Sequence, residues 1–333
     1  MNQTDSNFKK IIARVQQRYC GCDSKSIIDK KNGSTTQPAC QIICEATTGF
    51  IESNGINLFY RRTYCLDPNV NNPTLLFLHG LGASSANWTC QQKFFCEQGY
   101  TTIAFDFRGF GRSDKPTDPS QYTLDIFIND IRNVINHFDL VNPFIIGHSL
   151  GGYLALRYAL LYQNELSGIA TIGAFASLAD ATTDATNTIG QFIFTEQNLS
   201  KFVGAFLGFG FNEECNNIAC LKETSIKIGL QENLQSLQAL LSQIIPDLTQ
   251  NLLNINIPVF IVQGTIDALT NPRTGNKIHN AINTNKTGAG NASLYEVRQK
   301  GHFLFTTDVP TFNTALIDFL NPNVCHVCNI IEP

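Results

Sequence analysis

Short apolar runs alternate with amphipathic stretches along most of this chain. Each run has the length of a β-strand, and each amphipathic stretch repeats its apolar positions at the spacing of a helix. The runs cover residues 74–78, 102–105, 143–146, 168–172, 257–262 and 293–297, and the amphipathic stretches cover 87–98, 122–138, 150–163 and 309–320. This rhythm predicts an α/β fold with a mostly parallel central sheet, helices on both faces and functional sites at the carboxyl ends of the strands.

Two segments depart from this rhythm. Residues 50–60 alternate apolar and polar positions around Asn54-Gly55, a pattern that predicts an opening β-hairpin. Residues 176–250 hold a phenylalanine-rich stretch followed by leucines at helical spacing, which indicates a helical cap inserted into the sheet. The chain therefore divides into an N-terminal extension, a first core part, a cap, a second core part and a cysteine-rich tail, at residues 1–49, 50–175, 176–250, 251–322 and 323–333.

The charge content narrows the class of partner. Charged residues make up 15% of the 333 residues, below the soluble average of about 25%, and the formal net charge is −4. A chain with neither a net positive charge nor a basic stripe matches nucleic acid poorly, so we expect small neutral or apolar molecules as partners. The oligomeric state stays open.

The N-terminus and the lengths of the apolar runs indicate where in the cell the protein is expected. No window approaches the roughly 18 consecutive apolar residues of a membrane span, and the N-terminus lacks the apolar run of a secretory signal. We therefore expect no transmembrane segment and a soluble protein, cytoplasmic unless its cysteines reflect non-classical export.

Eleven cysteines are many for a cytosolic enzyme, and a cluster of them lies near the two ends of the chain. This cluster is Cys20, Cys22, Cys40, Cys44, Cys325 and Cys328. Disulfides that join the extension to the tail are the preferred interpretation. Zinc binding through Cys325 and Cys328 and a set of free thiols are the alternatives. Because the paired motifs of a complete zinc site are missing, neither a metal nor a cofactor is predicted.

The run Gly147–Gly151, GHSLG, is a GxSxG sequence between a predicted strand and a predicted helix. A serine at such a junction stands on a sharp turn, with its hydroxyl above the sheet and beside the amino end of a helix. Ser149 is therefore the candidate nucleophile. A tight turn with an incidental serine is the alternative interpretation of the same residues.

A serine nucleophile needs a general base and a carboxylate that orients the base, in the chain order Ser, Asp, His. His302 follows the last predicted strand, on a loop that can fold over the strand ends. Asp267 follows the preceding strand, where its carboxylate can reach the second ring nitrogen of His302 and fix the tautomer. Asp180 and Asp184, after an earlier strand, are the alternative acids, and an N-cap is the alternative role of Asp267.

Acyl transfer also needs hydrogen-bond donors aimed at the developing oxyanion. The backbone N–H of Leu150, directly after the candidate nucleophile, is the first candidate for this oxyanion hole. The second is the N–H of Leu81, in the loop 79–82 that follows a core strand. A purely structural turn is the alternative role of this loop, and the two roles are compatible because His79 can brace the peptide whose N–H acts.

Several of these motifs fall in a fixed order between residues 50 and 320. The blocks are Leu78–Trp88, Asp106–Ser113, Gly147–Gly152, Gly264 with Asp267, and Gly301 with His302. Together they resemble the α/β-hydrolase superfamily, and the pattern is similar to its capped esterases, C–C hydrolases, lactonases and cofactor-free haloperoxidase-like enzymes. The resemblance implies that the loop from Arg108 to Ser113 shapes the sheet edge and pocket wall, although a solvated turn is the alternative. Epoxide hydrolases and haloalkane dehalogenases are disfavoured, because their nucleophile is an aspartate where this chain has Ser149.

The residues and the resemblance together predict a serine hydrolase that cleaves a carboxylic ester of a small or apolar substrate through an acyl-serine intermediate. Ser149 attacks, His302 transfers the proton, Asp267 orients His302, and the N–H groups of Leu81 and Leu150 bind the oxyanion. Cleavage of an activated C–C bond or a lactone by the same triad is the enzymatic alternative. A ligand receptor that retains the triad, and an interaction protein that acts through its cysteine-rich ends, are the alternatives from other classes.

Overall fold

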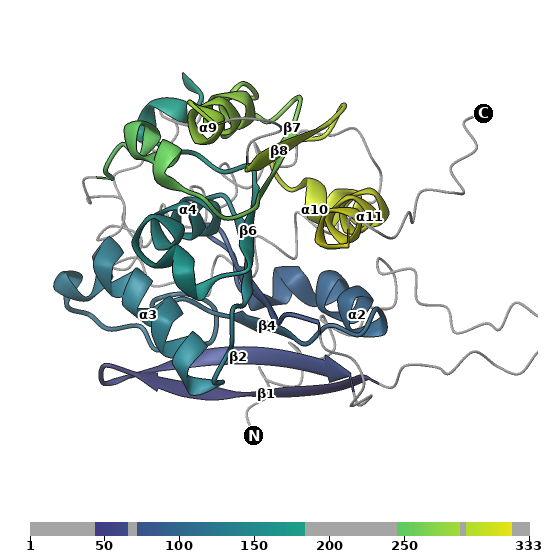
Figure 1. The fold of residues 1–333 in the computed structure, drawn as a ribbon. Helices are drawn as coiled ribbons and strands as arrows, with labels where there is room; N and C mark the ends of the chain where they lie inside the picture. Colours follow the sequence, from purple (N-terminus) through teal and green to yellow (C-terminus); the bar gives the residue numbers. More distant parts are fainter. Residues whose placement is uncertain (1–43, 66–71, 184–244, 287–290, 322–333) are drawn as a thin grey trace, which may run out of the picture.

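An eight-stranded sheet runs through the centre of the computed structural model (Figure 1), which describes residues 44–65, 72–183, 245–286 and 291–321. The strand order is β1-β2-β4-β3-β5-β6-β7-β8. β2 is antiparallel to β1 and to β4, and all other neighbours are parallel. The strands are β1 Cys44–Ser53, β2 Ile56–Cys65, β3 Leu75–Leu78, β4 Thr102–Phe105, β5 Phe144–His148, β6 Gly168–Ile172, β7 Val259–Gly264 and β8 Ala292–Val297. The mostly parallel sheet predicted from the sequence is confirmed.

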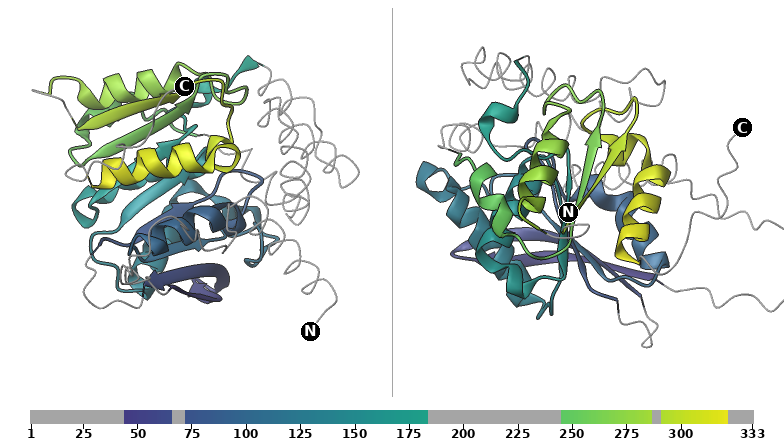
Figure 2. Two further views of the ribbon diagram at one scale, coloured as in Figure 1. Left: turned by 90° about the vertical axis from the view of Figure 1, so that its right-hand side faces the viewer. Right: turned by 45° about the horizontal axis from the view of Figure 1, so that its top comes forward.

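Helices cover both faces of this sheet, with α3, α4 and α9 on one face and α2 and α11 on the other (Figures 1 and 2). The helices are α2 Thr89–Glu97, α3 Leu124–His137, α4 Leu150–Tyr162, α9 Thr274–Asn283, α10 Leu304–Thr307 and α11 Val309–Leu320. Short 3₁₀ helices are η1 Ser85–Trp88, η2 Pro119–Tyr122, η3 Gln163–Glu165, η4 Leu178–Asp180 and η5 Thr249–Asn254. The predicted amphipathic stretches correspond to α2, α3, α4 and α11. None of the helices in the described ranges has both the length and the apolar character needed to cross a membrane.

β1 and β2 form the predicted hairpin at one edge of the sheet. Asn54 and Gly55 have φ angles of 50° and 82°, the positive values that a type I′ turn requires at both central residues. The pairing extends outward until Cys44 lies opposite Cys65. The first strand therefore begins before residue 50, where the core was expected to start.

A disulfide joins Cys44, at the start of this hairpin, to Cys96 in α2. Cys44 therefore does not join the extension to the C-terminal tail, because the pairing of β1 brings it against α2 instead. Cys90, in the same helix, is also disulfide-bonded. The candidate zinc ligands Cys325 and Cys328 and the remaining cysteines of the terminal cluster lie outside the described residues.

The two ends of the predicted cap lie together at the carboxyl edge of the sheet. The carbonyl oxygen of Ala176 accepts a hydrogen bond from the N–H of Leu248 at 2.9 Å, and the N–H of Thr182 donates to the carbonyl of Leu269 at 3.0 Å. The entry to the insertion is thus attached to the loop after β7. The body of the cap, residues 184–244, lies outside the described residues.

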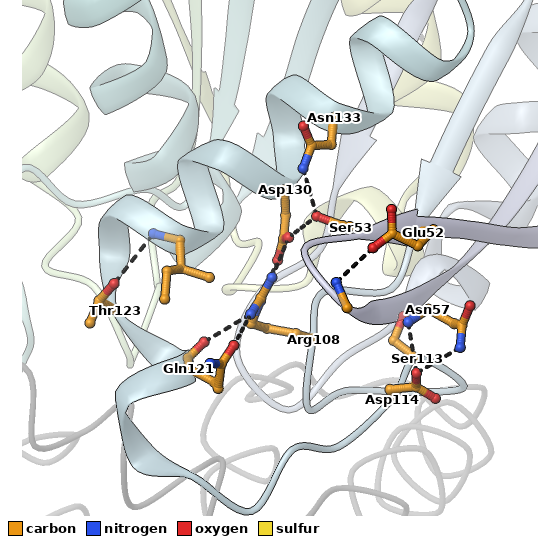
Figure 3. Close-up of polar contacts among 12 residues, drawn as sticks. Glu52, Ser53, Asn57, Arg108, Ser113, Asp114, Gln121, Thr123, Asp130 and Asn133 are labelled. Carbon is orange, nitrogen blue, oxygen red and sulfur yellow. Dashed lines mark hydrogen bonds and ion pairs between the residues drawn. The ribbon is translucent and has the colours of Figure 1, made fainter.

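A buried ion pair holds the loop that follows β4 (Figure 3). Arg108 donates to both carboxylate oxygens of Asp130 in α3 at 2.6 Å, and neither side chain is exposed. Ser53, at the end of β1, donates to Asp130 at 2.6 Å, and Gln121 accepts from Arg108 at 2.9 Å. These contacts join the hairpin, the loop and α3, so Arg108 does not belong to a solvated turn.

Candidate active site

Ser149 occupies the sharp turn between β5 and α4. Its φ is 52° and its ψ is −115°, a conformation that residues other than glycine rarely adopt and that is typical of functional sites. Neighbouring glycines make the turn possible. A Cβ on Gly147 would lie 2.2 Å from the carbonyl oxygen of Gly151, and a Cβ on Gly151 would lie 2.4 Å from that of Leu78. The serine is therefore held at the carboxyl end of β5 in a fixed orientation.

The loops after β7 and β8 bring Asp267 and His302 together. His302 Nδ1 lies 2.9 Å from Asp267 Oδ2, and both side chains are buried. An ionised carboxylate only accepts hydrogen bonds, so Nδ1 carries the proton and Nε2 is left as an acceptor. This is the tautomer that a general base for a serine hydroxyl requires.

Asp267 accepts hydrogen bonds from several donors in addition to His302. Its Oδ1 accepts from the N–H groups of Leu269 and Thr270 at 2.8 and 3.0 Å, and its Oδ2 also accepts from Thr270 Oγ1 at 2.7 Å and Gln263 Nε2 at 3.1 Å. Burial raises the pKa of Asp267, but the charge and hydrogen bond of His302 and the hydrogen bonds from Thr270 outweigh burial and lower the pKa. Asp267 is therefore ionised at neutral pH.

Sequence reasoning identified neither Gln263 nor Thr270 as part of the site. Gln263 is a buried polar residue in the otherwise apolar strand β7, which is the signal that points to it. Thr270 follows Asp267 by three residues, a spacing at which an aspartate side chain can accept a backbone N–H as it does at an N-cap. Both residues fix the carboxylate that faces His302.

The alternative acid Asp180 has a different role. Its Oδ2 accepts from the N–H groups of Ala176 and Ser177, and its Oδ1 lies 2.7 Å from Lys277 Nζ in α9. In the described part of the chain, these three groups account for the partners of this carboxylate. Asp180 therefore stabilises the start of the insertion, and the other alternative acid, Asp184, lies outside the described residues.

The loop after β3 lies against Ser149. A Cβ on Gly80 would lie only 3.0 Å from the Cβ of Ser149. His79 Nδ1 donates to the carbonyl oxygen of Gly80 at 2.8 Å. Because the C=O and N–H of a planar trans peptide point in opposite directions, the N–H of Leu81 points away from the His79 ring. This geometry leaves the Leu81 N–H available as a donor.

His79 is itself fixed by the loop after β4. The N–H of Phe107 donates to His79 Nε2 at 3.0 Å, so the ring uses one nitrogen as donor and the other as acceptor. Burial lowers the pKa of His79, although the charge of Asp106 and the bond to Gly80 oppose it. The neutral ring can therefore hold the Gly80–Leu81 peptide in one orientation.

Leu150, which supplies the other predicted donor, is the first residue of α4. The first N–H groups of a helix have no carbonyl one turn earlier, and they favour a negative charge beside them. The N–H of Leu150 thus lies at the end of the helix that begins beside Ser149. Within the described ranges, no group of three or more histidine, cysteine, aspartate or glutamate side chains is arranged to hold a metal ion.

The fold and this site together define a hydrolase of the α/β class. The model of the alpha/beta hydrolase fold family matches residues 73–309, so the chain belongs to this family.

Individual relatives agree with this assignment. The chain is 25% identical over 281 residues to the bifunctional esterase/perhydrolase DCH of Acinetobacter calcoaceticus. The matched region covers 80% of this chain and 97% of that protein. It is 30% identical over 122 residues, 37% of each chain, to epoxide hydrolase 2 of Siraitia grosvenorii. The first relatives are matched over about a third of their own length. The solved structure of an esterase from Rhodococcus shares the fold, with a TM-score of 0.71 at 20% identity over 82% of this chain and 98% of the esterase.

Proposed function

We propose that this protein hydrolyses carboxylic esters of small or apolar substrates, with Ser149 as nucleophile, His302 as general base and Asp267 as the orienting acid. The main support is the 2.9 Å contact between Asp267 and His302, in loops beside the strained turn that presents Ser149. The similarity to an esterase/perhydrolase over most of both chains supports ester chemistry. The low charge content of the chain favours uncharged substrates.

In the proposed reaction, Ser149 Oγ bonds to the carbonyl carbon of the ester while its proton moves to His302 Nε2. The C–O bond to the alcohol then breaks, and the alcohol leaves with the proton from His302. Water attacks the acyl-serine, giving its proton to His302. The carboxylic acid departs as Ser149 recovers this proton, so the enzyme is regenerated.

The carbonyl oxygen becomes an oxyanion in both halves of this reaction. The N–H groups of Leu81 and Leu150 are the proposed donors, and each donor of this kind contributes about 10² to 10³ in rate. The hydrogen bond from His79 to the carbonyl of Gly80 supports the role of Leu81, because it orients the peptide before the substrate binds. A preorganised donor needs no rearrangement during the reaction.

The similarity to epoxide hydrolases is compatible with this proposal. It covers about a third of the chain, and the fold and the Asp–His pairing are features that different hydrolases share. The residue that decides the chemistry is the nucleophile, and a serine forms an acyl-enzyme with esters. Lactones and activated C–C bonds can use the same triad, so they belong in the substrate panel.

The test compares the parent protein with Ser149→Ala on p-nitrophenyl esters of short and long acyl chains, beside a lactone and a C–C hydrolase substrate. Ser120→Ala, at an exposed serine, is the matched control. We expect Ser149→Ala to lose on the order of 10⁶ in kcat and Ser120→Ala to keep the parental value. An inert parent, or an active Ser149→Ala variant, would refute ester chemistry at Ser149. Activity on only the lactone or the C–C substrate would mean that the triad catalyses that reaction and not ester hydrolysis.

A further inference from the structure

The residue before the proposed nucleophile lies between the two loops that serve it. His148 is 1% exposed, and its Nε2 lies 3.0 Å from the main-chain carbonyl oxygen of His302. The ring centroids of the two histidines are 4.6 Å apart. On the other side, a Cβ on Gly80 would lie 2.9 Å from His148 Nδ1. His148 thus contacts both the loop of the general base and the loop of the oxyanion hole.

The protonation state of His148 follows from these contacts. A carbonyl oxygen only accepts hydrogen bonds, so Nε2 carries the ring proton. Nδ1 is buried and has no hydrogen-bond partner in the described part of the chain, so a second proton there would meet no acceptor. Burial first, and then the charge of His302 and of His79, lowers the pKa of His148 well below its usual value, although the bond to the His302 carbonyl opposes them. The ring therefore stays neutral at the pH at which His302 must gain and lose a proton.

We propose that His148 is a positioning residue for the general base. Its Nε2–H holds the carbonyl of His302 and so fixes the backbone from which the catalytic imidazole projects. This inference rests on the proposed function, since it assigns His148 a role in placing the proposed base. His148 itself does not touch the reacting atoms through this contact.

Packing alone does not explain a histidine at this position. The ring also lies against Phe303 and Phe305, with centroid distances of 4.9 and 4.7 Å, surroundings that an apolar ring would fill equally well. Only a donor, however, can satisfy the His302 carbonyl. Loss of the donor would leave a buried carbonyl without this bond, and the loop would have to shift to find another partner. Because a misplacement of about 1 Å can cost about 10² in rate, such a shift would act on catalysis.

The variants that separate the two roles are His148→Phe, which keeps a ring and removes the donor, and His148→Gln, which restores an N–H at a similar reach. We expect His148→Phe to lower kcat by about 10- to 100-fold with little change in KM, and His148→Gln to recover most of the loss. We expect the loop shift in His148→Phe to weaken the 2.9 Å contact between His302 and Asp267. The imidazolium is then less stabilised, so the acid limb of the kcat/KM profile should move to lower pH. His137→Phe, at an exposed histidine of α3, is the control and should match the parent.

A second measurement uses the parent protein and does not depend on the folding of any variant. Nitrogen-15 NMR of the histidine rings should show His148 as the Nε2–H tautomer, with no titration between about pH 5 and 8. Titration of His148 in this range, or the opposite tautomer, would overturn the proposal. A parental kcat and pH profile in His148→Phe would overturn it as well. If the parent instead lacks activity that depends on Ser149, it is the proposed function that fails, so the two failures are distinguishable.

Discussion

Replacing Asp267 with asparagine is expected to reverse the tautomer of His302. The groups around the carboxylate are all donors, namely Gln263 Nε2, His302 Nδ1, Thr270 Oγ1 and the N–H groups of Leu269 and Thr270. The amide oxygen must stay at the Oδ1 position, because the two backbone N–H groups there cannot accept. The NH₂ group then faces His302 Nδ1, which can accept only if its proton moves to Nε2.

With its proton on Nε2, His302 cannot take the proton of Ser149. A reversed tautomer of this kind lowers kcat by about 10⁴ in triad enzymes, which corresponds to about 5 kcal/mol of transition-state stabilisation. The assay is kcat for a p-nitrophenyl ester at neutral pH. Asp180→Asn is the matched control, because Asp180 is also a buried carboxylate near the strand ends and was one of the two alternative acids. A loss of similar size in Asp180→Asn, or a near-parental kcat in Asp267→Asn, would refute the assignment.

The same substitution also changes how stability depends on pH. The pKa of Asp267 is lowered in the folded protein, so the unfolded chain binds this proton more tightly than the folded one. The ionised carboxylate therefore stabilises the folded state above the unfolded pKa of about 4, and the contribution disappears as pH falls through the lower folded value. Urea unfolding should show a difference between the parent and Asp267→Asn that shrinks with acidification. A difference independent of pH would contradict this reasoning.

Three further substitutions test the rest of the structure. Asp130→Ala leaves the buried guanidinium of Arg108 unpaired and should cost about 3–5 kcal/mol of unfolding free energy in urea, most of which the double replacement Arg108→Met with Asp130→Leu recovers. Cys96→Ser removes a cross-link across a sequence separation of 52 residues, which chain entropy makes worth about 4 kcal/mol in the same assay. Gly173→Ala places a Cβ 3.0 Å from His302 Nδ1, at a φ of 52°, and should lower kcat in the ester assay.

Each of these three substitutions has a control. Glu97→Gln breaks a half-exposed ion pair with Lys93 and should cost no more than about 0.5 kcal/mol. Cys44→Ser should match the effect of Cys96→Ser if the two sulfurs pair. Gly55→Ala has a positive φ but nothing within 4 Å of the new Cβ, so it should alter stability without altering kcat. Equal losses of kcat in Gly55→Ala and Gly173→Ala would refute the inference that a Cβ on Gly173 acts through its contact with His302.

The strands and helices could be predicted from the sequence because their patterns are local. The run 168–172 matches β6, and Asn54-Gly55 has the turn conformation that these two residues favour. The strand order depends on contacts between distant segments, and no local pattern contains them. The partner of Cys44 is a case in point, since spacing alone does not define the connectivity of disulfides.

Some residues of the candidate site could likewise be predicted from local sequence, and others could not. Ser149 is marked by its neighbours in the chain, because a strained turn between strand and helix requires glycines on both sides. Gln263 and His148 are less clearly marked. Gln263 stands out only as a polar residue near the end of the otherwise apolar strand β7, and His148 fills a variable position of the GxSxG motif. Their partners are side chains and carbonyls that the fold brings from other loops, so their roles follow from the three-dimensional arrangement.

Three buried histidines lie close together at this edge of the sheet, and their partners distinguish them. His79 bonds a carbonyl and a backbone N–H, and His148 bonds a carbonyl and leaves Nδ1 without a partner in the described part of the chain. Burial lowers the pKa of both rings. His302 differs from these two because its Nδ1 faces the carboxylate of Asp267. Of the three rings, His302 is therefore the one whose geometry fits the proposed general base, while the other two hold the loops around it.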